Sequence, residues 1–173
     1  MDTDGLIHAG SGLDQVTWMD VRVGDWVATP RHGKPVEINA LWYNALCTMD
    51  MLQAKFGDND DSYRQLASLV KTSFNKRFWN ENTGCLYDVV DEDDDTIRPN
   101  QIYAVSLPFT MLDKEREKAI VDTVMDKLYV GCGLRSLDPD HKDYHPIYIG
   151  SLSKRDHAYH QGTAWGFLLG GFY

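Results

Sequence analysis

Apolar positions recur at spacings of three and four residues along one long stretch of the chain, between residues 36 and 56. This period matches one face of an α-helix, so the pattern predicts a helix from Val36 to Phe56. Pro35 stands at its start, where a missing N–H costs no hydrogen bond, and Gly57 suits a C-terminal stop. We expect the apolar stripe to face the core; its members are Ile38, Trp42, Ala45, Met49, Leu52 and Phe56.

The same period returns later in the chain and predicts further helices. They span residues 62–79, 99 to about 107, and 114–129 with Asp113 as the N-cap, and a fifth helix covers 162–173. Residues 1–35 and 134–161 are long irregular segments, and residues 85–90 form a short extended stretch. Strands are nearly absent, so the pattern predicts an all-α fold. Long polar and aromatic loops favour a toroid of α-hairpins over a four-helix bundle, whose loops are short.

Composition narrows the classes of partner. The 173 residues suffice for one domain with a hydrophobic core. The net charge of −9, from 26 acidic and 17 basic residues, argues against nucleic acid or an anionic membrane, whereas a neutral polysaccharide needs no opposite charge. Cys47, Cys85 and Cys132 lack metal, redox or disulfide spacing, so we expect free thiols and a cytoplasmic location. No signal peptide or membrane-spanning run is recognised.

Trp18 and Asp20, on the irregular N-terminal segment, form the first group with candidate chemistry. A carboxylate between aromatic rings is desolvated, which raises its pKa and lets it act as a general acid. The spacing by itself favours a turn aspartate that accepts a hydrogen bond from a nearby backbone N–H. Both interpretations stay open at this point.

A second group lies around the start of the first predicted helix and comprises Arg31, Lys34, Glu37, Asn39 and Trp42. Carboxylates are seldom buried unless they are paired, so Glu37 on a largely apolar helix needs a partner. One interpretation is a structural Arg31–Glu37 pair, with the carboxylate also favoured at the helix N-terminus. The other is that this turn faces a ligand.

A third group, Arg98, Asn100 and Gln101, opens the helix predicted from residue 99. Donors and amides at a helix start suit a ligand rich in hydroxyl groups, although helix capping is an alternative role. The acidic run at residues 91–95 is best interpreted as a solvated loop, because it lacks the ligand spacing and the glycine of a calcium loop.

A fourth group lies near the end of the second long irregular segment and comprises Arg155, Asp156, His157, Tyr159, His160 and Gln161, followed by Trp165. We favour a sugar pocket or a structural network over a metal site, because His141 and His145, although four residues apart, lie in a segment predicted as an irregular loop rather than on a helix. Nucleotide, redox and nucleophilic-serine motifs are not recognised, so we expect no metal and no cofactor.

Several segments of the chain are familiar as a set. They are Asp4-Gly5-Leu6, Thr17-Trp18-Met19-Asp20, Thr29-Pro30-Arg31, Gly33-Lys34-Pro35-Val36-Glu37-Ile38-Asn39-Ala40-Leu41-Trp42-Tyr43-Asn44, Arg98-Pro99-Asn100-Gln101, Gly133-Leu134-Arg135-Ser136-Leu137, and Arg155-Asp156 with Tyr159-His160-Gln161-Gly162-Thr163. This set resembles the C-terminal amylo-α-1,6-glucosidase domain of glycogen debranching enzymes, of the bacterial and archaeal type. The resemblance covers nearly the whole chain, and such motifs in the family's order are far more specific than any one alone.

The resemblance implies an (α/α)6 toroid that hydrolyses, with inversion, the α-1,6-linked glucose left at a trimmed glycogen branch. By carry-over, Asp20 is the general acid, and the general base lies in a downstream Pro-Glu motif that we expect beyond Tyr173. Residues 1–173 would then form a single, incomplete domain, truncated at its C-terminus and inactive alone. Its implied partners are a branched α-glucan and the remainder of the enzyme. Gly166 and Gly171 are mild departures, because the family usually has proline there.

The residues expected to contact the sugar come from all four groups. They are Trp18, Arg31, Glu37, Asn39, Trp42, Arg98, Asn100, Asp156, His160 and Gln161. We expect Glu37 to bind substrate hydroxyls rather than to replace the base, because it lies close to Asp20 in sequence. Two alternatives remain: a carbohydrate-binding remnant without catalysis, and another (α/α)6 glycosidase of the trehalase or glucosidase kind.

Overall fold

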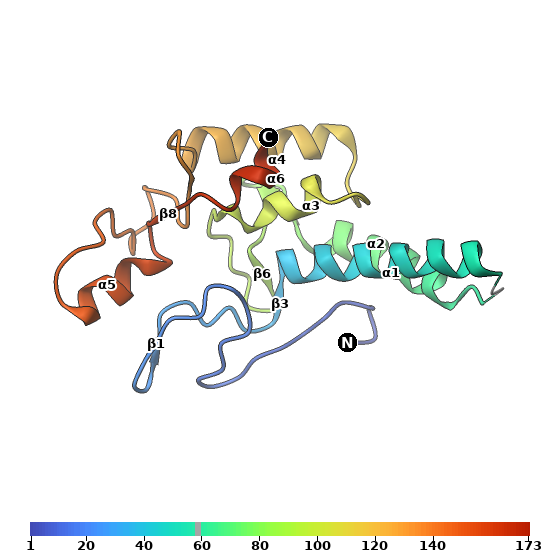
Figure 1. Cartoon of the computed structure of the whole chain (residues 1–173), viewed down its shortest axis with the longest axis horizontal. Coiled ribbons are helices and arrows are strands. Elements are labelled where there is room, and N and C mark those ends of the chain that lie inside the picture. Colours follow the sequence, from blue (N-terminus) through green and yellow to red (C-terminus); the bar gives the residue numbers. More distant parts are fainter. Residues whose placement is uncertain (58–59) are drawn as a thin grey trace.

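The computed structural model describes residues 1–57 and 60–173, and within these residues the chain is mainly helical with several very short strands (Figure 1). At one end of the molecule lies the α1–α2 hairpin, and at the other lie α5 and the β1 segment. The helices are α1 (Val36–Phe56), α2 (Ser62–Arg77), α3 (Tyr103–Ser106), α4 (Lys114–Lys127), α5 (Leu152–Tyr159) and α6 (Leu169–Phe172), with a 3-10 turn, η1 (Pro99–Ile102), directly before α3.

Helix α1 has the bounds that the sequence predicts. Pro35 adopts a φ of −67° immediately before it, and Gly57 ends it in the left-handed conformation, with a φ of 82°. The N–H of Gly57 donates to the carbonyl of Gln53, which satisfies one of the last carbonyls of the helix. Both boundaries are local features, and so they could be read from the neighbouring residues.

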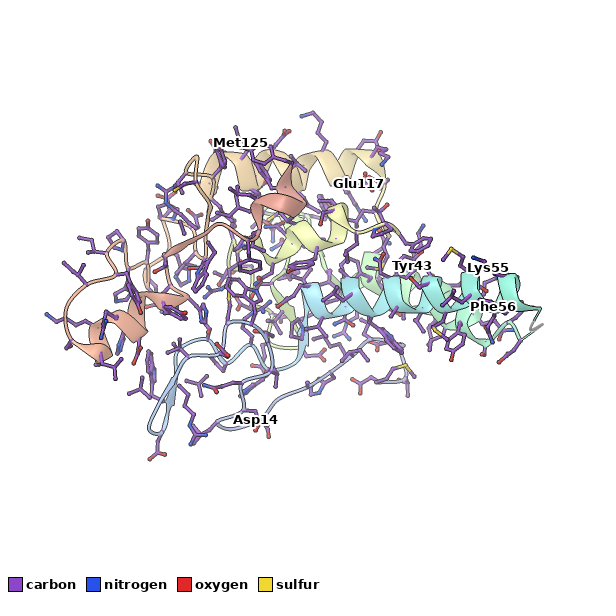
Figure 2. All side chains as sticks on the ribbon, in the orientation of Figure 1. Asp14, Tyr43, Lys55, Phe56, Glu117 and Met125 are labelled. Carbon is purple, nitrogen blue, oxygen red and sulfur yellow. The ribbon has the colours of Figure 1, made fainter. Side chains whose placement is uncertain are left out.

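The prediction that the apolar stripe of α1 faces the core holds only in part, because Trp42 packs against the core but Ala45 is exposed. Met49 and Phe56 are 39% and 77% exposed, and Phe56 lies at the outer end of the helix (Figure 2). The buried face instead carries Val36, Glu37, Asn39, Ala40, Asn44 and Leu46. Its polar members are buried because they have fixed partners: the Asn44 amide, for example, donates to the carbonyl of Phe109 and accepts from its N–H.

The short strands form four antiparallel pairs of two residues each within the described part of the chain. The pairs are β1 (Arg22–Val23) with β2 (Trp26–Val27), β3 (Lys34–Pro35) with β6 (Val89–Val90), β4 (Trp79–Asn80) with β5 (Cys85–Leu86), and β7 (Leu134–Arg135) with β8 (Ala164–Trp165). The β3–β6 pair matters most for the site, because it brings the start of α1 beside the extended stretch predicted at residues 85–90.

Three predicted elements need correction. The second helix ends at Arg77, because Trp79 pairs with Leu86 in the β4–β5 ladder. The segment 134–161, predicted as a loop, contains β7 and α5. The segment 162–173 is not one helix: residues 164–165 pair with β7 as a strand, so only Leu169–Phe172 is helical.

The core is one cluster of buried side chains to which α1, α2, η1 and α4 all contribute. Phe74 and Phe78 stack at a centroid distance of 4.4 Å, and Ile120, Val124 and Leu128 of the α4 region are fully buried. As predicted, the Asp113 side chain caps α4 by accepting from the N–H of Arg116. Within the described residues, no helix has the length and apolar character that crossing a membrane requires.

Candidate functional site

The irregular N-terminal segment and the last part of the chain meet at Trp18. Its ring makes edge-to-face contacts with His160 at 5.2 Å, Trp165 at 5.6 Å and Phe167 at 5.1 Å between centroids. Such perpendicular arrangements are favourable for aromatic pairs. The first and fourth groups of the sequence therefore come together in one aromatic cluster.

Asp20 lies at the solvent edge of this cluster. Its neighbour Met19 is fully buried, and the Met19 carbonyl accepts a hydrogen bond of 2.8 Å from the hydroxyl of Thr29. Asp20 itself is exposed. The aromatic enclosure that we expected around this carboxylate surrounds Trp18 and His160 instead, and Asp20 is open to solvent.

His160 is a buried, neutral imidazole. Burial lowers its pKa to about 4; the charge of Asp20 acts in the opposite direction, and that of Arg98 adds to the lowering. Its Nδ1 atom is buried and has no hydrogen-bond partner among the described residues. A neutral imidazole can donate or accept at this position, which suits contact with a hydroxyl group.

Arg31 and Glu37 form a buried ion pair with two contacts between guanidinium and carboxylate, one of them 2.7 Å long. The structural pair that the sequence allowed is thus present. Arg31 also donates to Asp88, with Nε 2.6 Å from Oδ2 and Nη2 3.0 Å from Oδ1. Burial opposes the charged form of Arg31, but Asp88 and Glu37 outweigh it and raise the pKa of the guanidinium.

Asp88 is a central site residue that the sequence reasoning missed. It lies 3.8 Å from Nε of Arg98 and accepts a 2.8 Å hydrogen bond from the Asn100 amide, besides its two contacts with Arg31. Burial raises the pKa of its carboxyl, while the two guanidinium groups favour the ionised form. The available signal was one carboxylate within the apolar run of residues 85–90, since a buried carboxylate requires partners.

The third and fourth groups are joined by Arg98. Its guanidinium donates to the carbonyls of Ser136 at 2.9 Å and His160 at 2.8 Å, and to Oε1 of Gln161 at 2.7 Å. The structure therefore places Arg98, Asn100, His160 and Gln161 in one continuous network with Trp18.

Three predicted sugar-binding residues lie differently. The Asn39 amide bonds to the backbone of Ile7 and to the Pro35 carbonyl, and the Trp42 indole donates to the Gly5 carbonyl. These two residues fasten the N-terminal segment onto α1. Asp156 is partly buried on α5.

A polar cavity of about 350 Å³ lies next to this network. Its walls include Arg31, Arg98 and Gln161 from the predicted set, whereas Asp20 and Trp18 are not among its lining residues. Among the described residues, no group of three or more His, Cys, Asp and Glu side chains is arranged to hold a metal ion. The side chains brought together at this site are carboxylates, amides, guanidinium groups, an imidazole and aromatic rings.

The chain matches the amylo-alpha-1,6-glucosidase family model over residues 1–173, and it belongs to this family. It is also similar to the glycogen debranching enzyme of Saccharomyces cerevisiae, with 29% identity over an alignment of length 216. That alignment covers 97% of this chain and 14% of the yeast protein, so the chain spans a small part of the length of the relative that it matches.

Proposed function

We propose that this chain supplies the acid side of an amylo-α-1,6-glucosidase site, which hydrolyses α-1,6-linked glucose at the branch points of glycogen or limit dextrin in the cytoplasm. One observation carries the proposal: Trp18, Arg98, Asn100, His160 and Gln161, from separate motifs, form one network beside Asp20 in a chain of this family. We further propose that residues 1–173 are one incomplete domain of an (α/α)6 toroid within a larger enzyme.

In this mechanism Asp20 is the general acid that protonates the glycosidic oxygen as the bond to the anomeric carbon breaks. Its exposed position supports the role, because a polymeric substrate must reach it from solvent. With inversion, a second carboxylate about 6.5–9.5 Å away removes a proton from the attacking water. We propose that this base comes from a Pro-Glu motif outside these residues. Glu37 is less suited, because it is buried and paired with Arg31.

We propose that some of the predicted residues contact the sugar directly and that others support the site from within the protein. Trp18 and His160 offer an aromatic face and an imidazole near Asp20, and Gln161 offers an amide at the cavity wall. Glu37 and Asn39 act indirectly, because their polar groups bond within the protein, whereas Arg31 lines the cavity while it is paired with Glu37.

Substitution of the proposed acid tests this function. In the protein that contains this chain, Asp20→Asn should lower kcat for glucose release from a glucosyl-branched limit dextrin by about 10²- to 10⁴-fold, since the amide cannot deliver the proton. The anomer released first, followed by NMR, should be β-glucose if the reaction inverts.

Asp25→Asn is the matched control, because Asp25 is an exposed aspartate on the same segment. It should leave glucose release near that of the unmodified protein. Near-normal turnover in Asp20→Asn would contradict the acid assignment. Calorimetric binding of the branched glucan without any glucose release from the unmodified protein would favour a carbohydrate-binding role.

A further inference from the structure

Asp88 connects the buried ion pairs to the residues beside Asp20. It is buried on the turn before β6 and receives donors from Arg31 and Asn100, and Asn100 in turn contacts Trp18. We propose that Asp88 is a positioning residue, which holds the Trp18 indole and hence the backbone at Asp20 in place through the Asn100 amide. The kinetic part of this inference rests on the proposed function, whereas its geometric part does not.

The hydrogen-bond donors and acceptors of Arg31, Asp88 and Trp18 fix the orientation of the Asn100 amide. Arg31 has donors only, and an ionised Asp88 has acceptors only. Asn100 has both, so its NH₂ group must face Asp88, at 2.8 Å, and its oxygen must face the other way. That oxygen accepts from the Trp18 indole Nε1 at 2.8 Å. An acceptor-only group at position 88 is therefore what orients the amide toward Trp18.

Asp88 is itself held firmly by its backbone. Its carbonyl accepts from the N–H of Val36 at 3.0 Å, and its N–H donates to the carbonyl of Asp94 at 2.8 Å. The next two residues pair with β3, with Val89 opposite Pro35. These backbone contacts therefore hold Asp88 against the start of α1.

The charges around Asp88 are balanced. Two guanidinium groups, Arg31 and Arg98, face two carboxylates, Glu37 and Asp88, and all four residues are buried. A buried carboxylate with two charged partners and a third donor keeps its orientation, because each lost contact would leave a charge unpaired.

The other end of the connection holds the residues around Asp20. Asn100 Nδ2 and Arg98 Nη1 lie 3.7 Å and 3.8 Å from the sulfur of Met19, and the Met19 carbonyl accepts from Thr29. Trp18 and Met19, the two residues before Asp20, are therefore both held by the same amide. A change in the Asn100 orientation would move the carboxylate without touching it.

The test combines Asp88→Asn, Trp18→Phe and the double variant in the protein that contains this chain. The readout independent of activity is the indole N–H signal of Trp18 in ¹H–¹⁵N NMR spectra, identified by its loss in Trp18→Phe. In Asp88→Asn we expect this signal to shift and its hydrogen exchange to speed up about fivefold, as for a lost hydrogen bond. We expect kcat for glucose release to fall about tenfold or more, with KM changed less than about twofold.

The double variant separates positioning from a merely structural role. If Asp88 acts through the Trp18 indole, Asp88→Asn should lower kcat no further in the Trp18→Phe background; additive losses would overturn the inference. The control is Asp4→Asn, which perturbs a separate ion-pair group with Lys34 and Arg77 and should leave the Trp18 signal unchanged.

Asn100→Ala keeps the Arg31–Asp88 pair and provides the second variant if Asp88→Asn does not fold. It should change the Trp18 signal in the same way. An unchanged Trp18 signal in a folded Asp88→Asn or Asn100→Ala protein overturns the inference. If the Trp18 signal changes in these variants but the unmodified protein releases no glucose, the positioning role is supported and only the proposed function is contradicted.

Discussion

His160 combines a buried imidazole with an aromatic setting. Trp18, Tyr159 and Trp165 lie around its ring, and the depressed pKa of about 4 keeps it neutral at physiological pH. A neutral imidazole can exchange hydrogen bonds with sugar hydroxyls without attracting counter-ions. The same depressed pKa makes the stability of the fold depend on pH.

We predict that His160 makes the fold less stable in mild acid. Between pH 6.5 and 4 the unfolded chain binds a proton at His160 that the native state does not, so the free energy of unfolding falls as the pH falls. The slope from this residue should approach about 1.4 kcal/mol per pH unit. Urea unfolding at pH 7, 6 and 5 should show this slope reduced in His160→Gln and kept in the exposed control His8→Gln. Equal slopes in all three proteins would count against the assignment.

At the scale of elements, the β3–β6 pair joins the start of α1 to the Asp88 turn. Gly33 immediately precedes β3 with a φ of 107°, and an added Cβ would lie 2.7 Å from the Val90 carbonyl oxygen. Gly33 also exchanges two backbone hydrogen bonds of 2.9 Å with Ala9. Three segments therefore approach one another closely at a position that only glycine fits.

We predict that Gly33→Ala destabilises the protein by about 3 kcal/mol, through both backbone strain and displacement of β6. Gly24→Ala is the matched control: its φ is 59°, but nothing lies within 4 Å of the added Cβ. That variant should lose only about 1 kcal/mol, the cost of the left-handed conformation. Chemical denaturation measures both values, and similar losses would mean that the contact with Val90 contributes little.

Features that depend on residues close together in the sequence could be predicted, whereas contacts between distant residues could not. The bounds of α1 and the Asp113 cap follow from adjacent residues, and the Arg31–Glu37 pair spans only six positions. The inward face of α1 could not be predicted, because its neighbours come from elsewhere in the chain. Asp88 was missed because a two-residue ladder has no local signature and its contact with Arg31 spans 57 positions.

At the scale of the whole molecule, Arg98 connects the middle of the chain to its last part. Its guanidinium donates to Ser136, His160 and Gln161, over separations of 38 to 63 residues. Asp88 lies on the other side of the same guanidinium. The planar, forked geometry of arginine allows these contacts at once, and lysine could not reproduce them.

We predict that Arg98→Lys loosens one end of the molecule selectively. Amide hydrogen exchange of residues 157–162 should speed up about tenfold, because local opening no longer breaks the two hydrogen bonds from Arg98 to His160 and Gln161. Exchange in the α1–α2 hairpin should stay within about twofold of its original rate. A uniform increase throughout the chain would instead indicate global destabilisation.

Apart from the two-residue β1–β2 ladder, side chains of other segments hold much of the first 35 residues in place. Asn39 holds Ile7, Trp42 holds Gly5 and Asn100 holds Trp18, over separations of 32, 37 and 82 residues. Contacts so distant in sequence close late during folding, because the loop entropy must be overcome first. The segment that carries Asp20 is therefore expected to be the last to fold, so refolding molecules would regain their helices before they regain an ordered site.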